Sequence, residues 1–278
     1  MTGMAEPLSA EGAQLLAAGR AFDAVEVLRR AVASGEQAAP DLLVQAYLDS
    51  GSWHAAAEWL APLVAQGQVR FAGRLGVAYV EIGDDERAEG ALRLAVESGE
   101  LPAANDLAIL LRDTGRLREA VLVLGRAADA GDGQAPSNLV SLHAEAGELH
   151  LAVAAAERYA DESRPDSMVA LADVRALQGR HEEAEQLYQW AGRRDAVQAH
   201  TAYGQFLLVQ GDPGGAEREF REAQRHNEPG WAYTLAMFLI EDGRPVEARE
   251  YLVIAVGWGN RAAVAALAEL DGEDPTDD

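Results

Sequence analysis

The chain has 278 residues, of which 49% are hydrophobic and 25% are charged, values that are ordinary for a globular protein. It has no cysteine and its 23 basic residues are all arginine, which excludes disulfides, thiolate metal sites, Walker-type phosphate lysines and Schiff-base lysines. The formal net charge of −23 repels nucleic acid and anionic membranes, so we expect neither as a partner. This charge favours a basic partner, or serves only to keep an alanine-rich chain in solution.

The sequence shows neither a membrane span nor a secretory signal. No apolar run is long enough to span a bilayer, and the N-terminal residues lack a basic region followed by an apolar core. We therefore expect a cytoplasmic protein. Residues 272–278 are acidic and lack large apolar side chains, which predicts a disordered tail.

An internal repeat organises the rest of the chain. Glycine recurs every 32 residues, and alanine stands five residues after each of these glycines. A fixed period of this size is typical of solenoids built from pairs of helices. The glycines are Gly19, Gly51, Gly83, Gly115, Gly147, Gly179, Gly211 and Gly243, and the alanines are Ala24, Ala56, Ala88, Ala120, Ala152, Ala184, Ala216 and Ala248.

The predicted helices alternate along the chain in a regular order. A first helix precedes each periodic glycine, which we expect to end it with a positive φ, and a second helix follows. A further glycine ends most second helices, but Ser163, Asp195 and Asn227 stand at this place in units five, six and seven. After Gly259, residues 260–270 repeat the start of a first helix with no second helix to follow, which predicts a capping helix. Several first helices open with proline, at Pro40, Pro102, Pro136 and Pro165.

Side-chain size also recurs with the repeat. Leucine is usual eight residues before each periodic glycine, and a small residue or valine follows it. In the third unit these residues are Leu75 and Gly76, while Leu92 stands nine residues after the glycine. Because a larger side chain would push the helices of a pair apart, the alanine row predicts a close helix crossing in every unit.

This pattern resembles the tetratricopeptide and Sel1-like repeat families. Leu75-Gly76, Tyr79, Gly83, Ala88, Leu92 and Ala95 match the tetratricopeptide pattern, and the run from Ala95 to Ala108 is similar to the segment between Sel1-like repeats. The resemblance implies an all-α fold, a right-handed α-solenoid of about eight helix-turn-helix repeats over residues 8–271. It further implies first helices that line a concave groove and a protein-interaction scaffold. The family's clamp for a carboxylate-ending tail needs lysines, so it does not carry over.

Polar residues at the expected groove positions are candidates for binding a peptide. Hydroxyl and amide side chains in a line can hydrogen-bond the backbone of an extended segment; the alternative is that they form an ordinary solvated surface. The candidates are Asn105, Arg112, Ser137, Ser141, Asp173, Thr201, Gln205, Tyr233 and Met237.

His143 and Arg175 are a second candidate, for an anionic ligand. They interrupt a row of apolar and aromatic residues four positions before the periodic glycine, in consecutive units. Stacked repeats would bring them near each other and near Asp173. The alternative is that each packs by its stem or pairs with a local acid.

No catalytic, phosphate-binding or metal-binding motif occurs in the sequence, so we predict no cofactor, no metal and no catalytic residue. The prediction is a non-catalytic scaffold that binds a protein or peptide. The alternative is a small-molecule-binding or catalytic solenoid with its site around repeats five to seven. A third alternative is a structural homo-oligomer that associates through an end of the stack.

Overall fold

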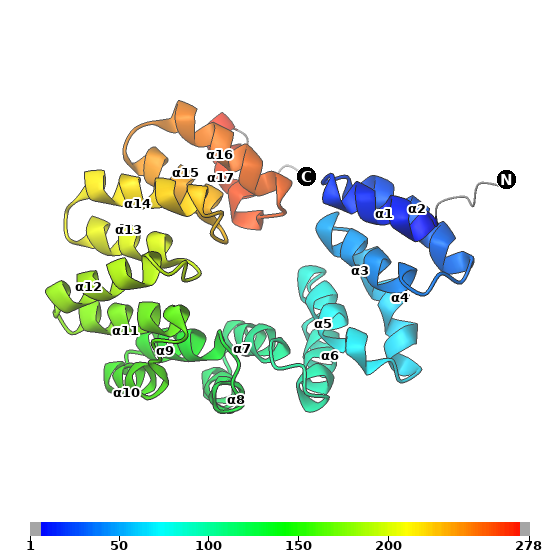
Figure 1. The fold of residues 1–278 in the computed structure, drawn as a ribbon, viewed down its shortest axis with the longest axis horizontal. Coiled ribbons are helices and arrows are strands. Elements are labelled where there is room, and N and C mark those ends of the chain that lie inside the picture. The colour runs from blue at the N-terminus through cyan, green and yellow to red at the C-terminus, as the bar shows by residue number, and fades with distance from the viewer. Residues whose placement is uncertain (1–6, 273–278) are drawn as a thin grey trace. The chain divides into compact units, whose positions relative to one another are not determined.

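In the computed structural model, residues 7–272 are described. This range contains seventeen α-helices, one short 3₁₀ helix and no strand, so the all-α prediction is confirmed (Figure 1). Apart from Gly272, the tail predicted at residues 272–278 lies outside the described residues. The chain divides into two compact units, Met1–Val123 (unit 1) and Leu124–Asp278 (unit 2).

Unit 1 contains the helices of the first three repeats and the beginning of the fourth. Consecutive helices from α1 to α7 pack on one another, and the first helices α1 and α3, as well as α5 and α7, also contact each other. The helices are α1 (Leu8–Ala17), α2 (Ala21–Ala33), α3 (Ala39–Asp49), α4 (Trp53–Ala65), η1 (Val69–Phe71), α5 (Ala72–Glu81), α6 (Asp85–Glu97), α7 (Ala103–Asp113) and α8 (Leu117–Asp129), in which the boundary falls.

Unit 2 continues the same alternation. The first helices α9, α11 and α13 pack side by side, and α17 packs on α16 as the predicted capping helix. The helices are α9 (Ala135–Glu145), α10 (Leu149–Tyr159), α11 (Pro165–Leu177), α12 (His181–Gly192), α13 (Ala199–Val209), α14 (Pro213–Arg225), α15 (Trp231–Glu241), α16 (Pro245–Gly257) and α17 (Arg261–Asp271).

The turn inside each pair has the backbone geometry that the periodic glycine predicts. All eight periodic glycines have a positive φ, between 65° at Gly51 and 80° at Gly211, the left-handed region that glycine enters without a Cβ penalty. Asp195 and Asn227 adopt the same region without being glycine, with φ of 54° and 51°. Ser163 does not adopt this left-handed conformation, and helix α10 of the same repeat ends earlier, at Tyr159.

The core of each pair is as close as the alanine row predicts. All eight periodic alanines are completely buried, with 0% of their surface exposed. A Cβ atom added to Gly76 would lie 2.5 Å from Cγ of Leu92, and one added to Gly204 would lie 2.5 Å from Cε1 of Phe220. The small residue of the first helix therefore leaves the space that the bulky residue of the second helix fills.

Carboxylates stabilise the starts of first helices across neighbouring repeats. Glu36 accepts hydrogen bonds from the backbone N–H groups of Leu8 and Ser9, at 3.1 and 2.8 Å. Six repeats later, the equivalent Glu228 accepts them from His200 and Thr201, at 2.8 and 2.9 Å. Each acid satisfies N–H groups that have no partner within their own helix.

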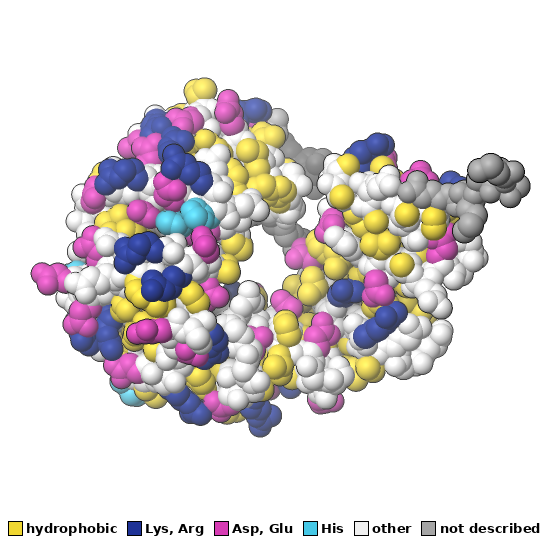
Figure 2. All heavy atoms as spheres, in the orientation of Figure 1, with side chains coloured by type: hydrophobic (Ala, Val, Ile, Leu, Met, Phe, Trp, Pro, Cys, Tyr) yellow, Lys and Arg dark blue, Asp and Glu magenta, His cyan; other side chains and the backbone are white. Residues whose placement is uncertain are grey.

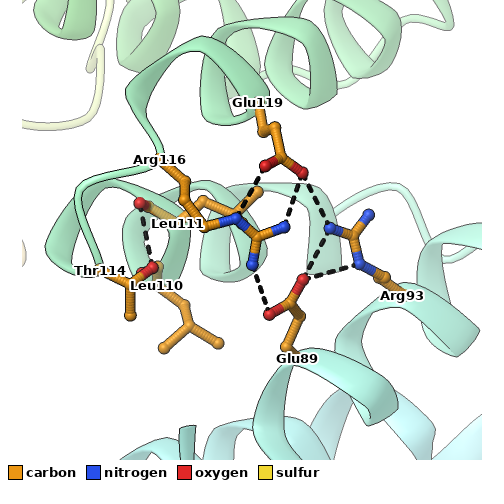
Figure 3. Close-up of polar contacts among 7 residues, drawn as sticks. All are labelled: Glu89, Arg93, Leu110, Leu111, Thr114, Arg116 and Glu119. Carbon is orange, nitrogen blue, oxygen red and sulfur yellow. Dashed lines mark hydrogen bonds and ion pairs between the residues drawn. The ribbon is translucent and has the colours of Figure 1, made fainter. Parts of the chain in front are cut away.

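Two networks of arginine and glutamate link successive second helices. In Figure 3, Arg116 binds Glu89 of α6 at 2.7 Å and Glu119 of α8 at 2.6 Å, and Arg93 also binds both acids. The same figure includes Thr114, which follows the end of α7 and donates its hydroxyl to the carbonyls of Leu110 and Leu111, at 2.8 and 3.2 Å. Four repeats later an equivalent network is formed by Glu217, Arg221, Arg244 and Glu247.

Candidate functional site

A cavity of about 500 Å³ lies on the first helices of unit 2, and it is named here the polar cavity. Hydroxyl, amide and carboxylate side chains make up much of its wall. The lining comes from helices α9, α11, α13 and α15, from the segments before them, and from Asn260 before α17. Figure 1 shows the order of these helices along unit 2. The lining residues are Gln134, Ser137, Asn138, Ser141, Asp166, Val169, Ala170, Asp173, Val197, Gln198, Thr201, Ala202, Gln205, Pro229, Gly230, Tyr233, Thr234 and Asn260.

The repeat itself builds this cavity. Most of its lining falls on four rows of residues spaced by 32, so each first helix contributes the same face. Because the rows run through three or four successive repeats, equivalent positions recur along the wall. The rows are 134, 166, 198 and 230; 137, 169, 201 and 233; 138, 170, 202 and 234; and 141, 173 and 205.

The nine candidate groove residues fall into three groups. Asn105 is buried in α7 and Arg112 pairs with Asp113 at 2.9 Å; both belong to unit 1. Met237 lies on α15 but does not line the polar cavity. The remaining six line it together: Ser137, Ser141, Asp173, Thr201, Gln205 and Tyr233.

The lining groups differ in their availability to a ligand. The Thr201 hydroxyl donates to Glu228 at 2.7 Å, and Asp166 accepts the backbone N–H of Val197 at 2.5 Å. Within the described part of the chain, the side chains of Ser137, Ser141 and Gln205 make no hydrogen bond. Ser141 and Gln205 are also exposed, so these groups can bind a ligand without breaking a contact of the fold.

Asp173 is the most unusual group of the wall. Its carboxylate accepts a hydrogen bond of 2.6 Å from the hydroxyl of Tyr188, a residue only 3% exposed. Tyr188 is itself held by aromatic contacts with Tyr203 and Phe206, at 5.7 and 5.4 Å between ring centroids. Burial raises the pKa of Asp173 from its ordinary value of 3.8 to about 6, against the lowering effect of the Tyr188 hydrogen bond.

A second cavity, of about 470 Å³, adjoins the first and is named here the apolar cavity. Ser141, Asp173, Ala202 and Gln205 line both cavities. Beyond these four, aliphatic and aromatic side chains predominate. The other lining residues are Val140, Ala144, Glu145, Ala176, Leu177, His181, Tyr188, Phe206, Val209 and Gln210.

His143 and Arg175, the candidate ligand residues, line neither cavity. His143 Nδ1 lies 2.9 Å from a carboxylate oxygen of Glu148. Arg175 pairs with Glu157 at 2.8 Å, and its side chain is only 12% exposed. Each therefore already has a carboxylate partner in its own neighbourhood.

Sequence reasoning missed the rows at 134 and 138 and the partner of Asp173. The sequence does contain a signal for this partner. Tyr188 stands where leucine is usual in the second helix of its repeat, and Asp173 is on the first helix of the same repeat. Among the described residues, no group of three histidine, aspartate or glutamate side chains could hold a metal ion. No helix in that range combines the length and the apolarity needed to cross a membrane.

Solved structures of tetratricopeptide repeat proteins are similar to this chain at low identity. One from Parabacteroides merdae is 15% identical, with a TM-score of 0.42, and the match covers 74% of this chain and 87% of that one. A thermophilic protein of this class from Thermus thermophilus, TTC0263, is 18% identical, with a TM-score of 0.49, over 61% of this chain and 98% of that one. No family model matches the chain, and no curated protein does.

At these identities and TM-scores, the matches are no evidence of what this chain does, and the resemblance rests on its own repeat. The features that carry the resemblance are the helix-turn-helix unit, its glycine turn and its buried alanine, and the structure contains all three in every repeat. The chain is therefore a helical repeat protein whose repeat unit resembles that of tetratricopeptide proteins.

Proposed function

We propose that the chain is a non-catalytic scaffold that binds an extended segment of a partner protein in the polar cavity. The observation that carries this proposal is the regular wall, in which four successive first helices supply hydroxyl, amide and carboxylate groups on rows spaced by 32. An extended peptide exposes N–H and C=O groups along its length, and such side chains can donate to or accept from both.

The residues with no intramolecular partner set the expected contacts. The amide of Gln205 can donate to a backbone carbonyl and accept from a backbone N–H, and the hydroxyls of Ser137 and Ser141 can do the same. Thr201 is already engaged with Glu228, so its role is to hold the wall. Because repeat proteins commonly present extended surfaces for binding, the placement agrees with the architecture.

A peptide selection tests the proposal. The full chain is immobilised and used to select from a displayed library of random heptapeptides, and the recovered peptides are synthesised and titrated by calorimetry. We expect wild type to bind these peptides with dissociation constants in the micromolar range, as for a small preformed site. This corresponds to a binding free energy on the order of −8 kcal/mol.

Two variants decide where the peptide binds. Ser141→Tyr places a bulky side chain at an exposed position where the two cavities meet, and should weaken binding at least about tenfold by occupying the site. Val264→Tyr makes a similar increase in size on α17, at a side chain that is 53% exposed and lines neither cavity, and should leave binding unchanged. The proposal is wrong if wild type selects no peptide, or if the two variants bind alike.

The alternative small-molecule site has one observation in its favour. The volume of about 500 Å³ is within the range of pockets that hold small ligands. Mass spectrometry of small molecules released from the protein purified from its native source distinguishes the two. A stoichiometric organic ligand that Ser141→Tyr eliminates would favour the alternative.

A further inference from the structure

Acidic side chains predominate among the charged groups that line the two cavities. The chain has 23 basic residues, yet no arginine whose side chain the structure describes lines either cavity. The acids that do are Asp166, Asp173 and Glu145, and the one lining side chain able to carry a positive charge is His181. A ligand that supplies a cation would therefore meet complementary charge, and none of the described arginine side chains would compete with it at the cavity wall.

Of these acids, Asp173 is the one that lines both cavities. Asp166 is occupied by the backbone N–H of Val197, and Glu145 has an interaction of its own. Asp173 accepts only the neutral hydroxyl of Tyr188, and no ion pair reaches it within the described part of the chain. A partly buried carboxylate with one neutral donor has room for a charge-assisted hydrogen bond from a ligand.

The position of Asp173 restricts what that ligand group can be. The carboxylate stands where the polar cavity meets the apolar cavity, so a group that reaches it contacts both polar and aliphatic surface. Leu177, which is 56% exposed, and Phe206 and Val209 line the apolar side. Lysine and arginine combine an aliphatic stem with a cationic tip, which matches this border.

We infer that the partner segment carries a lysine or arginine whose stem lies in the apolar cavity and whose cationic tip binds the Asp173 carboxylate. This rests on the proposed function, and adds the identity of the residue that the site recognises. The peptide backbone then lies along Ser141 and Gln205, which line both cavities. The net charge of −23 draws a basic segment toward the protein before this contact forms.

A set of synthetic heptapeptide libraries tests this inference. Each is N-acetylated and C-amidated, is random at six positions, and carries arginine, lysine, citrulline, norleucine or glutamate at the centre. Binding to the full chain is measured by fluorescence anisotropy at pH 7.5. We expect arginine and lysine to bind at least about tenfold more tightly than citrulline and norleucine, because a charge-assisted hydrogen bond replaces a neutral one.

Two variants assign the preference to Asp173. Asp173→Asn keeps an oxygen that can accept the Tyr188 hydroxyl, so we expect it to fold, and its preference for arginine over citrulline should fall below about twofold. Glu182→Gln removes an equal charge from the exposed first turn of α12, outside both cavities, and should keep the wild-type preference. Circular dichroism before and after heating confirms the fold of each variant.

The outcomes separate the inference from the function on which it rests. If no library binds wild type, the proposed function fails. If libraries bind but the citrulline library has the same affinity as the arginine library, the groove still binds peptides and the inference is wrong. The same holds if Asp173→Asn keeps the preference for arginine over citrulline. If free N-acetyl-lysine amide binds as tightly as the lysine library, the site takes a small cation, and the peptide source is overturned.

Discussion

At the scale of single residues, the side chain that the second helix packs against the first helix limits the size of the residue it faces. A Cβ added to Gly76 would lie 2.5 Å from Cγ and 3.2 Å from the backbone nitrogen of Leu92, a residue that is completely buried. Neither the backbone nor a side chain enclosed on all sides can move away cheaply. The glycine is therefore required by packing, and its φ plays no part.

Gly76→Ala should accordingly destabilise the protein by about 1–3 kcal/mol, the usual cost of overpacking a core. The matched control is Gly90→Ala in the middle of α6, where an added Cβ meets nothing within 4 Å. That change should stabilise the helix by about 0.5–1 kcal/mol, because alanine loses less backbone freedom than glycine. Urea unfolding measures both, and equal effects would contradict the packing account.

Asp173 illustrates a conflict between stability and binding. Its pKa is about 6 in the folded chain and near 3.8 when unfolded, so the folded state binds the proton more tightly. The free energy of unfolding therefore falls as pH rises through the window from about 4 to 6, and stays lower above it. The other titratable groups that line the apolar cavity are Glu145, His181 and Tyr188.

From this sign, Asp173→Asn should stabilise the free protein by about 1–3 kcal/mol at pH 8 and have little effect at pH 4. The measurement is urea unfolding of wild type and variant at both values. A variant that is less stable than wild type at pH 8 would show that the carboxylate supports the fold rather than a ligand. Gain of stability with loss of binding is the pattern expected of a functional group.

At the scale of helices, the arginine and glutamate networks link successive second helices, α6 with α8 and α14 with α16. Arg221 binds Glu217 and Glu247, both at 2.8 Å, and its pKa is raised chiefly by the hydrogen bonds to these two acids, the one to Glu247 being the larger. Its side chain is 34% exposed, so solvent and salt screen part of the attraction.

Arg221→Met should cost about 0.5–1 kcal/mol at low salt, and less than half of that in 1 M sodium chloride. Arg218→Met is the control, because Arg218 lies three residues away on the same helix, is exposed, and has no ion pair within the described residues. Denaturant midpoints at two salt concentrations measure the difference. A salt-independent loss at Arg221 would mean that packing of its stem, and not charge, links the helices.

The helices could be predicted from the sequence because their signals are local. A positive φ at glycine, a proline near a helix start and an alanine at a close crossing each act within a few residues, and the repeat presents the glycine and the alanine eight times. The fifth repeat shows the limit of this reasoning. Ser163 takes the place of the second glycine, the left-handed turn is absent there, and α10 ends at Tyr159.

The candidate site was only partly predictable, for a physical reason. A period of 32 tells which residues share a face, but not how far each first helix is rotated against the next. The rows at 137 and 141 were therefore expected at the groove, while those at 134 and 138 were not. The contact between Asp173 and Tyr188 depends on side-chain length across the helix pair, which spacing alone does not give.

At the scale of the whole molecule, two properties bear on function. One is the organisation of the chain into units 1 and 2; that residues 8–271 form one continuous domain stays a prediction. The other is the net charge of −23. On the face of unit 2 that Figure 2 shows, acidic and basic side chains lie next to each other. Arg175, Arg180, Arg221 and Arg244 all form ion pairs with glutamates, so the excess acids set the long-range field.

This field predicts that binding of a basic peptide depends on salt. The dissociation constant should rise at least about threefold between about 50 and 500 mM sodium chloride, mainly through a slower association rate. A citrulline-centred peptide of the same length, without other charges, should change little. Stopped-flow fluorescence gives both rates, and equal salt dependence of the two peptides would exclude long-range attraction as the cause.

The central claim is that the first helices of unit 2 form the binding face of this repeat protein. Amide chemical-shift mapping by NMR, with the tightest selected heptapeptide added to the isotope-labelled chain, tests it most directly. We predict perturbations centred on α9, α11 and α13, at Ser137, Ser141, Asp173 and Gln205, and extending to Tyr233 of α15. Perturbations confined to the second helices α10, α12 and α14, or to unit 1, would contradict the account.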